Sequence, residues 1–354
     1  MRAVRLNAWK SDPVRTEIPI PEPGPGQVLI QVGGAGACHS DLHLMREFGT
    51  GSEAWEPPFT LGHENAGWVH TLGDGVRGWE PGQPVAVVGA WGCGRCARCR
   101  AGVDIYCEDP AAAPVPGGGG GLGLDGGMAD YLLVPAERFL VPLPDGLDPV
   151  HAAPITDAAL TPYHAIRRSL PKLTPDAIAL VIGAGGLGHL GVQLLKTLTG
   201  ARVVVVEPRE SAGRLAARSG ADLVLAPGSD TVALIRDFTS GRGVDLALDF
   251  VGSDETIATA AKSARPLGDV TIVGIAGGSF PVSFTSLPPE VSVQTTYWGT
   301  RAELVELFDL AARGLLTPEI EVFDLDDALT AYRRLEAGDV RGRAVIAPSA
   351  TYSG

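Results

Sequence analysis

The chain has 354 residues, of which 45% are hydrophobic and 19% are charged, and its formal net charge is −13. This length is enough for two domains, and the composition is that of a well-buried globular enzyme and not of a disordered chain. The negative charge repels phosphate backbones, so we do not expect a nucleic acid partner.

The first part of the chain, residues 1–155, contains short alternating segments interrupted by Pro and Gly. Clear examples occupy residues 27–32, 67–72 and 83–88. Such segments predict a compact β-barrel-like domain with long functional loops. The N-terminal residues 1–6 already alternate like a strand and contain no apolar run of signal-peptide length.

A first group of metal-ligand residues lies in this part. Cys38 stands in the segment Ala-Cys-His-Ser-Asp-Leu-His, and His63 follows 25 residues later in Gly-His-Glu. A catalytic zinc uses three protein ligands and keeps one position open. Cys38 and His63 supply two ligands, and the candidates for the third are Glu64 and Asp157, because the remaining cysteines form a separate cluster.

That cluster consists of Cys93, Cys96, Cys99 and Cys107 in a C-x2-C-x2-C-x7-C spacing. Four thiolates make a closed tetrahedral shell, which predicts a structural zinc and not a reaction centre. The alternative of two disulfides is disfavoured by the metal-type spacing and by the missing secretory segment. Zinc-ligating thiols and the absence of a signal predict a cytoplasmic protein.

The pattern of apolar and polar residues changes after this cluster. Residues 117–121 are five consecutive glycines, which we interpret as a flexible surface loop. From about residue 176, apolar runs alternate with helical stretches, which predicts a parallel sheet buried on both faces. The runs are residues 178–182, 203–206, 246–251 and 270–275, with a weaker one at 293–298. The apolar stretch 177–195 is interrupted by glycines, so we expect a strand and a helix in place of a membrane span.

A nucleotide-binding fingerprint follows the first of these strands. Gly183, Gly185 and Gly188 form G-x-G-x-x-G and precede a helix expected over residues 187–198. The next strand ends in Glu207, where a carboxylate binds ribose hydroxyls and repels a 2′-phosphate. This pattern favours NAD over NADP, although Arg209 is a basic residue that could accept a 2′-phosphate.

The last part, from residue 301, contains two helical patterns, residues 302–313 and 325–337, and a short strand at 343–346. We expect it to return to the first domain, because the parallel sheet already has its strands.

Together these residues resemble the zinc-dependent medium-chain alcohol dehydrogenases, over nearly the whole chain. The matching motifs are Cys-His-Ser-Asp at 38–41, Gly-His-Glu at 62–64, the four-cysteine lobe, Ala-Gly-Gly-Leu-Gly at 184–188 and Tyr-Trp-Gly-Thr at 297–300. The sequence looks most similar to bacterial secondary-alcohol dehydrogenases and carbonyl reductases. The resemblance implies an α/β fold: a GroES-like β-barrel catalytic domain (1–155), a Rossmann domain with a doubly wound parallel sheet (156–297) and a C-terminal return to the catalytic domain (298–354).

The resemblance also implies roles for individual residues of the catalytic domain. Asp157, which precedes Thr-Pro-Tyr-His, matches the third ligand of the catalytic zinc; otherwise a helix N-cap would be the ordinary interpretation. Ser40 matches a hydroxyl that contacts the alcohol, and His43 matches the base at the end of a proton relay. Glu64 matches an acid behind the zinc that can ligate it transiently.

Further matches concern the cofactor and the substrate. His39 and Arg343 match cations near the pyrophosphate. The implied cofactor-binding set also includes Thr161, Gly183, Gly185, Gly186, Leu187, Gly188, Glu207, Arg209, Val251, Val273, Ile275, Trp298 and Gly299. Trp55 and Trp298, with Ser40, are expected to line the substrate pocket, although core aromatics are the alternative. The loop between Met45 and Phe59 does not match the family pattern.

The implied activity is hydride transfer between NAD(H) and secondary alcohols or ketones, with two zinc ions per chain, at a cleft between the domains. A polyol or amino-alcohol dehydrogenase could use the same zinc site, but the apparent pocket wall is apolar. A zinc-free quinone or enoyl reductase would lack the cysteine lobe, and a non-catalytic NAD-binding protein would tend to lose Ser40 and His43. We expect a small-molecule substrate, no membrane partner, and a homodimer or homotetramer.

Overall fold

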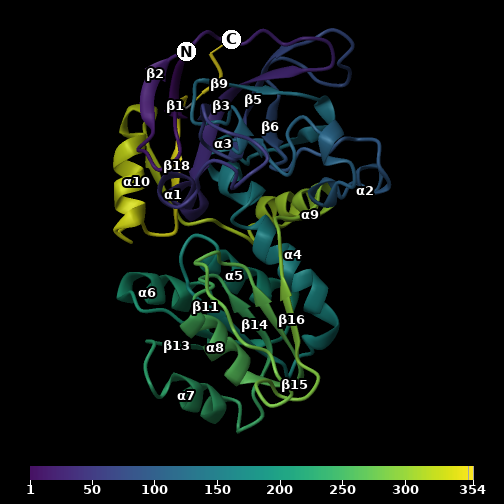
Figure 1. Ribbon diagram of the computed structural model, residues 1–354. Helices are drawn as coiled ribbons and strands as arrows, with labels where there is room; N and C mark the ends of the chain where they lie inside the picture. The colour runs from purple at the N-terminus through teal and green to yellow at the C-terminus, as the bar shows by residue number, and fades with distance from the viewer. Residues whose placement is uncertain (350, 354) are drawn as a thin grey trace. The chain divides into compact units, whose positions relative to one another are not determined.

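The computed structural model describes residues 1–349 and 351–353. The chain forms two compact units (Figure 1). The first contains residues Met1–Leu160, Trp298–Gly314 and Pro318–Gly354, and the second contains Thr161–Tyr297 and Leu315–Thr317. The first segment of this unit therefore ends five residues beyond the boundary at residue 155 that the resemblance implied.

The first unit is built mainly from antiparallel strands. One sheet pairs strands in the order β2-β1-β4, and a larger sheet runs β10-β6-β5-β3-β18-β17, with β9 also paired to β3. The bounds are β1 (Arg2–Leu6), β2 (Val14–Glu17), β3 (Val28–Ala37), β4 (Phe59–Thr60), β5 (Glu64–Leu72), β6 (Pro84–Val87), β7 (Gly119–Gly120), β8 (Gly123–Leu124), β9 (Tyr131–Val134), β10 (Leu140–Pro142), β17 (Ile320–Phe323) and β18 (Arg343–Ile346).

The helices of this unit have between 4 and 12 residues. Their bounds are α1 (His39–Arg46), α2 (Ala97–Arg100), α3 (Pro149–Ala152), α9 (Arg301–Ala312) and α10 (Ala328–Glu336), with 3-10 turns at Asp104–Tyr106, Pro110–Ala112, Glu137–Phe139, Ala153–Thr156 and Leu325–Asp327. The C-terminal strand β18 is antiparallel to β3. The last part of the chain therefore lies in the same sheet as the N-terminal strands.

The register of three adjacent strands brings separate chain segments to one end of this sheet. Ala344 of β18 pairs with Ala37 of β3, and Gly36 of β3 pairs with Glu64 of β5. Every residue of β3 is buried, so this strand forms the centre of the unit. The residues that follow β3, precede β5 and begin β18 consequently lie together, although they are distant in the sequence.

The second unit contains a six-stranded parallel sheet, as the apolar runs predicted. Its order is β13-β12-β11-β14-β15-β16, which is the 3-2-1-4-5-6 order of doubly wound nucleotide-binding sheets. The bounds are β11 (Ile178–Ile182), β12 (Arg202–Val206), β13 (Leu223–Leu225), β14 (Val244–Asp249), β15 (Ala264–Ile272) and β16 (Ser292–Thr295). The helices are α4 (Leu160–Ser169), α5 (Gly188–Leu198), α6 (Glu210–Arg218), α7 (Thr231–Phe238) and α8 (Asp254–Ser263), with a 3-10 turn at Leu170–Lys172.

The buried run of β11 coincides with the predicted strand, because its five residues are all apolar and all buried. Elsewhere the strands are shifted: β14 ends at Asp249 and β15 ends at Ile272, so the last residues of both predicted runs belong to the following loops. Within the described residues, every helix is too short or too polar to cross a membrane.

The five-glycine segment is not a flexible surface loop, and that prediction was wrong. Gly118 to Gly121 are buried, and Gly119 and Gly120 form the short strand β7. A Cβ atom on Gly119 would lie 1.9 Å from the carbonyl oxygen of Gly89. Gly121 has a φ of +84°, and a Cβ there would lie 2.5 Å from the backbone of Gly62. Glycine is required because backbone segments approach one another closely, not because the segment needs to be mobile.

This packing predicts unequal effects of alanine at two glycines that both have positive φ. Gly121→Ala introduces backbone strain and also a clash with Gly62, whereas a Cβ on Gly117 has no neighbouring atom within 4 Å. We expect Gly117→Ala to cost about 1 kcal/mol, and Gly121→Ala to cost about 1–3 kcal/mol more, as overpacking does. Urea unfolding of both variants measures the difference, and equal costs would contradict the close packing.

Candidate functional site

A cluster of potential metal ligands lies at the end of the large sheet in the first unit. Cys38 follows β3, His63 precedes β5, Glu64 begins β5, and Asp157 follows the turn Ala153–Thr156. One ligand atom from each of these four side chains lies within 4.8 Å of the others. The structure thus brings together the two residues that we paired from the sequence and both candidates for the third ligand. Asp157 is the most exposed of the four, at 14% for its side chain.

Glu64 is held by a buried arginine. Arg343 Nε donates to Glu64 Oε2 at 3.0 Å, and Arg343 Nη2 donates to Oε1. Gly36 opposite makes room for this carboxylate, because a Cβ there would overlap the Glu64 side chain. The surrounding Cys38 and Glu64 raise the pKa of Arg343 despite its burial. The guanidinium therefore remains charged inside the protein and neutralises part of the negative charge of the cluster.

The charge of Arg343 also acts on Cys38. Burial favours the neutral thiol, but Arg343 and His63 outweigh that effect and lower the pKa of Cys38 to about 7. A thiolate is the form of cysteine that binds metals. The site thus favours the ligand form of this side chain.

A further carboxylate, Asp41, supports the two ligands and was not identified from the sequence. Its Oδ2 accepts a hydrogen bond from the backbone N–H of Cys38 at 3.0 Å, and its Oδ1 lies 3.2 Å from Nδ1 of His63. Cys38 is the N-cap of α1 and Asp41 is its third residue. This capping position in Cys-His-Ser-Asp was the available signal, since a side chain at N3 reaches back to the N-cap amide.

Two polar side chains of α1 are the ones that the resemblance assigns to a proton relay. Ser40 Oγ is 3.3 Å from His63 Nε2. His43, one turn further along the helix, has its Nδ1 2.9 Å from Glu47 Oε1. This contact orients the imidazole. His39 is the first residue of the same helix and is exposed.

Asp157 does not cap a helix that starts at Ala158. The next helix, α4, begins at Leu160, and Asp157 itself closes the preceding 3-10 turn with φ −140° and ψ −57°. Its Oδ2 is 3.7 Å from Nε2 of His63 and 4.0 Å from Nη2 of Arg343. The carboxylate thus faces the cluster, which is the arrangement that a ligand needs.

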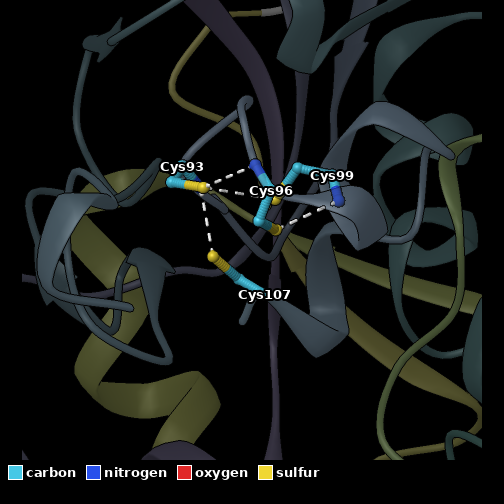
Figure 2. Close-up of side chains that lie close together, drawn as sticks. All are labelled: Cys93, Cys96, Cys99 and Cys107. Atoms are coloured by element: carbon cyan, nitrogen blue, oxygen red, sulfur yellow. Dashed lines mark hydrogen bonds between the residues drawn. The ribbon is translucent and has the colours of Figure 1, made fainter. Parts of the chain in front are cut away.

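The second group of ligands is the cysteine lobe, and its geometry suits a metal ion. The sulfurs of Cys93, Cys96, Cys99 and Cys107 lie within 4.8 Å of one another and turn toward a common centre (Figure 2). Backbone N–H groups donate to these sulfurs, for example from Cys99 to Cys96 at 3.4 Å. The amides of Cys99 and Glu108 lower the pKa of the Cys96 thiol to about 6. Such bonds stabilise thiolates, as a closed four-sulfur metal shell requires.

In the second unit, the expected nucleotide-binding residues gather at one edge of the parallel sheet. The glycine segment follows β11, Glu207 follows β12, Val251 follows β14, and Val273 and Ile275 follow β15. The carboxyl ends of parallel strands meet at one edge, where nucleotides bind in this fold. A Cβ on Gly188 would lie 1.9 Å from the carbonyl oxygen of Gly183, so the turn into α5 requires glycine there. Gly186 and Leu187 complete the turn, and Leu187 is the N-cap of α5.

Glu207 is already engaged by protein donors. Its Oε2 accepts the N–H of Ala184 at 2.7 Å, and its Oε1 accepts Nε of Arg209 at 2.8 Å. Burial acts to raise the pKa of Glu207, but Arg209 and the backbone amides lower it below the ordinary value. The carboxylate is therefore negatively charged. The guanidinium of Arg209 also lies beside Gly185, since a Cβ there would be 3.3 Å from Nη2.

The two tryptophans expected in the substrate pocket have different surroundings. Trp298 is buried, and its ring meets the ring of His63 edge to face, with 5.8 Å between the centroids. Trp55 belongs to an aromatic group in which its centroid lies 5.7 Å from that of Trp9 and 5.4 Å from that of Phe59. Trp298 is thus the tryptophan next to a metal-ligand side chain.

The remaining cofactor candidates are Thr161, Gly299 and Arg343. Thr161 is a buried residue in the first turn of α4. Gly299 packs against Leu160, and a Cβ there would lie 2.6 Å from that side chain. Arg343 interacts with Glu64, as described above.

Comparisons with known proteins agree with this architecture. The alcohol dehydrogenase GroES-like domain matches residues 24–145, and the zinc-binding dehydrogenase family matches residues 186–313. The NAD-dependent alcohol dehydrogenase of Saccharolobus solfataricus is 35% identical over 357 residues, covering 98% of this chain and 100% of that protein.

Two solved structures are similar over the same length. The alcohol dehydrogenase of the archaeon Aeropyrum pernix has a TM-score of 0.90 and 36% identity, covering 98% of this chain and 100% of the other. An acetophenone reductase from Geotrichum candidum, in complex with NAD, has a TM-score of 0.85 and 31% identity. The match covers 98% of this chain and 96% of the other. With a GroES-like first unit, a nucleotide-binding second unit and full-length relatives, the chain belongs to the zinc-binding alcohol dehydrogenase family.

Proposed function

We propose that the chain is a zinc-dependent oxidoreductase that transfers a hydride between NAD(H) and secondary alcohols or ketones. The observation that carries this proposal is the largely buried cluster of Cys38, His63, Glu64 and Asp157, separate from the four-cysteine lobe. Zinc, when bound there, supplies a Lewis acid that polarises the alcohol or carbonyl oxygen. The relatives named above act on alcohols and on an aryl ketone, and their chemistry requires a small-molecule substrate.

Asp157 is the third ligand in this proposal, and Glu64 is the supporting acid. Both oxygens of Glu64 accept hydrogen bonds from Arg343, so moving Glu64 onto a metal would break a buried ion pair. Separating a buried pair is costly, because it leaves an uncompensated charge. The carboxylate of Asp157 faces the same cluster, with its Oδ2 3.7 Å from Nε2 of His63, which supports its assignment as the ligand.

Proton movement is assigned to α1. Ser40 lies next to His63 and would accept the proton of the alcohol, and His43 would take it up at the end of the relay. Residues three apart on a helix lie on the same face, which suits such a relay. His39, Arg343, Thr161, Trp298 and Gly299 complete the cofactor-binding set in this proposal. Trp298 and Trp55 supply apolar surface for the substrate.

NAD is the preferred cofactor in this proposal because of the charged carboxylate of Glu207 at the end of β12. A carboxylate there accepts hydrogen bonds from ribose hydroxyls and repels a 2′-phosphate. Arg209 is bound to this carboxylate and is not available as a free cation. The helix α5, which starts at the glycine turn, provides the backbone N–H groups for the pyrophosphate.

We also propose that the chain forms a homodimer or homotetramer and acts in the cytoplasm. The edge strand β16 supports self-association, since it has one neighbouring strand, β15, and a largely exposed sequence. A reducing compartment suits the five cysteines, none of which forms a disulfide.

The metal assignment predicts the effect of Asp157→Ala. The variant should keep the zinc of the cysteine lobe and lose the other ion, so that elemental analysis falls from about two equivalents to about one. We expect kcat to fall by about 1,000-fold or more, because Lewis-acid stabilisation is worth several kcal/mol.

Three further variants serve as controls for the metal assignment. Glu64→Gln should keep both ions, Cys38→Ser should lose turnover with the fold retained, and Cys96→Ser should impair folding or assembly. If Asp157→Ala retains two zinc ions and near-normal rates, the third ligand is Glu64 or water.

The relay predicts a milder effect for His43→Ala. Alcohol oxidation should fall about 10–100-fold below neutral pH, where solvent base is scarce, and much less at alkaline pH, as loss of a general base implies. Zinc content should not change. A pH profile of kcat tests this, and a uniform loss at all pH values would argue against a proton relay through His43.

The nucleotide site predicts that Glu207→Ala changes cofactor preference. Loss of the carboxylate should raise KM for NAD about 10–100-fold, because a charge-assisted hydrogen bond is worth about 1.5–3 kcal/mol. KM for NADP should fall, since the repelling charge is gone and Arg209 is released. Steady-state kinetics with both cofactors measure this change. If the unmodified enzyme already uses NADP with the higher kcat/KM, Arg209 determines the preference.

A further inference from the structure

Asp41 is a fully buried carboxylate at 0% exposure, and its environment has three polar partners. Two of them belong to the proposed zinc site: the backbone N–H of Cys38 and the Nδ1 atom of His63. A single carboxylate thus contacts the backbone of one proposed ligand, Cys38, and the side chain of another, His63. The contact of 3.2 Å between Oδ1 and Nδ1 of His63 lacks hydrogen-bond geometry, so hydrogen bonds to Oδ2 hold the carboxylate and the third partner matters for its position.

The third partner is Tyr332 on α10. Its hydroxyl donates to Asp41 Oδ2 at 2.8 Å and lies 3.0 Å from the sulfur of Met128. The two residues are 291 positions apart in the sequence. Tyr332 is itself buried, and burial together with Asp41 raises its pKa well above the ordinary value. The phenol is therefore neutral and acts as a hydrogen-bond donor inside the core.

Oδ2 receives two of these hydrogen bonds, from Tyr332 and from the amide of Cys38. If the hydroxyl were absent, this buried oxygen would keep a single donor. The carboxylate could then rotate, and the rotation would change the distance between Oδ1 and His63. Removing one partner from a buried charged group is costly for this reason.

We propose that Tyr332 is a positioning residue of the catalytic zinc site: its hydroxyl orients Asp41, which in turn orients Cys38 and His63. The proposal rests on the proposed function, in which Cys38 and His63 bind the catalytic zinc. It gives α10 a role in the reaction, although none of its side chains belongs to the metal-ligand cluster. Residues that orient metal ligands commonly change metal affinity about 10–100-fold when they are replaced.

The test compares Tyr332→Phe with the unmodified holoenzyme. The ring and its packing remain, and only the donor is lost. We expect the catalytic zinc to be removed by a chelator about tenfold faster, whereas the zinc of the cysteine lobe leaves at an unchanged rate. The cobalt-substituted enzyme should show shifted ligand-field absorption bands, a signature that reports ligand geometry and not global stability. The matched control is Tyr131→Phe, which removes a hydroxyl from β9 in the same unit and should change neither quantity.

A double-variant comparison with Asp41→Asn separates positioning from packing. If the hydroxyl acts through Asp41, Asp41→Asn alone must also accelerate loss of the catalytic zinc, and adding Tyr332→Phe should change the rate less than about twofold further. An equal effect of Tyr332→Phe in both backgrounds, or wild-type zinc retention in Tyr332→Phe, would overturn the proposal. If Tyr332→Phe does not fold, Asp41→Asn still tests the proposal. Unchanged retention of the catalytic zinc in Asp41→Asn would overturn it. An unmodified enzyme that contains only the lobe zinc would refute the proposed function and this inference together.

Discussion

The candidate zinc site depends on one electrostatic constraint: several acidic groups share a small buried volume. Cys38, Glu64 and Asp157 present ligand atoms within 4.8 Å of one another, together with His63. Acidic side chains in such proximity repel one another, and burial increases the cost of each charge. In the proposed function, a divalent cation bound there would balance part of this charge. The protein balances another part with Arg343, which is why an arginine is buried at 2% exposure in the core.

This constraint also explains the path of the last part of the chain. After α9, the chain adds β17, α10 and β18 to the first unit, and β18 pairs with β3 beside the residue that precedes Cys38. Two side chains of this segment meet acidic groups of the site: Arg343 binds Glu64, and Tyr332 binds Asp41. The C-terminal segment thus completes the electrostatic environment of ligands that are encoded far upstream.

The features that the sequence predicted correctly are encoded locally. The strand over residues 178–182 is a continuous apolar run between a turn and a glycine segment, so its bounds follow from composition alone. The cysteine cluster also lies within one short segment, and its spacing already implies convergence of the four sulfurs.

The features that the sequence analysis missed depend on long-range packing. The capping position of Asp41 can be seen in the sequence, but its contact with Tyr332 at 2.8 Å depends on the packing of α10. Composition predicts a flexible loop for the five-glycine segment. Glycine occurs both where the backbone needs conformational freedom and where two backbone segments must approach closely, and composition alone does not distinguish these two cases. The distinction requires the backbone partners, Gly89 and Gly62, which are distant in the sequence.

Both units use a carboxylate in the same way, to fix a segment to which the proposed function assigns a metal ion or a cofactor. Asp41 accepts the N–H of Cys38 and the hydroxyl of Tyr332, and Glu207 accepts the N–H of Ala184 and the guanidinium of Arg209. In each case one bond goes to the backbone of the binding segment and another goes to a side chain. The backbone bond restricts the segment before any ligand arrives, which lowers the ordering cost of binding. Both carboxylates are buried, and they differ in their side-chain partner. Asp41 has the buried phenol of Tyr332, whereas Glu207 has Arg209, whose side chain is 36% exposed.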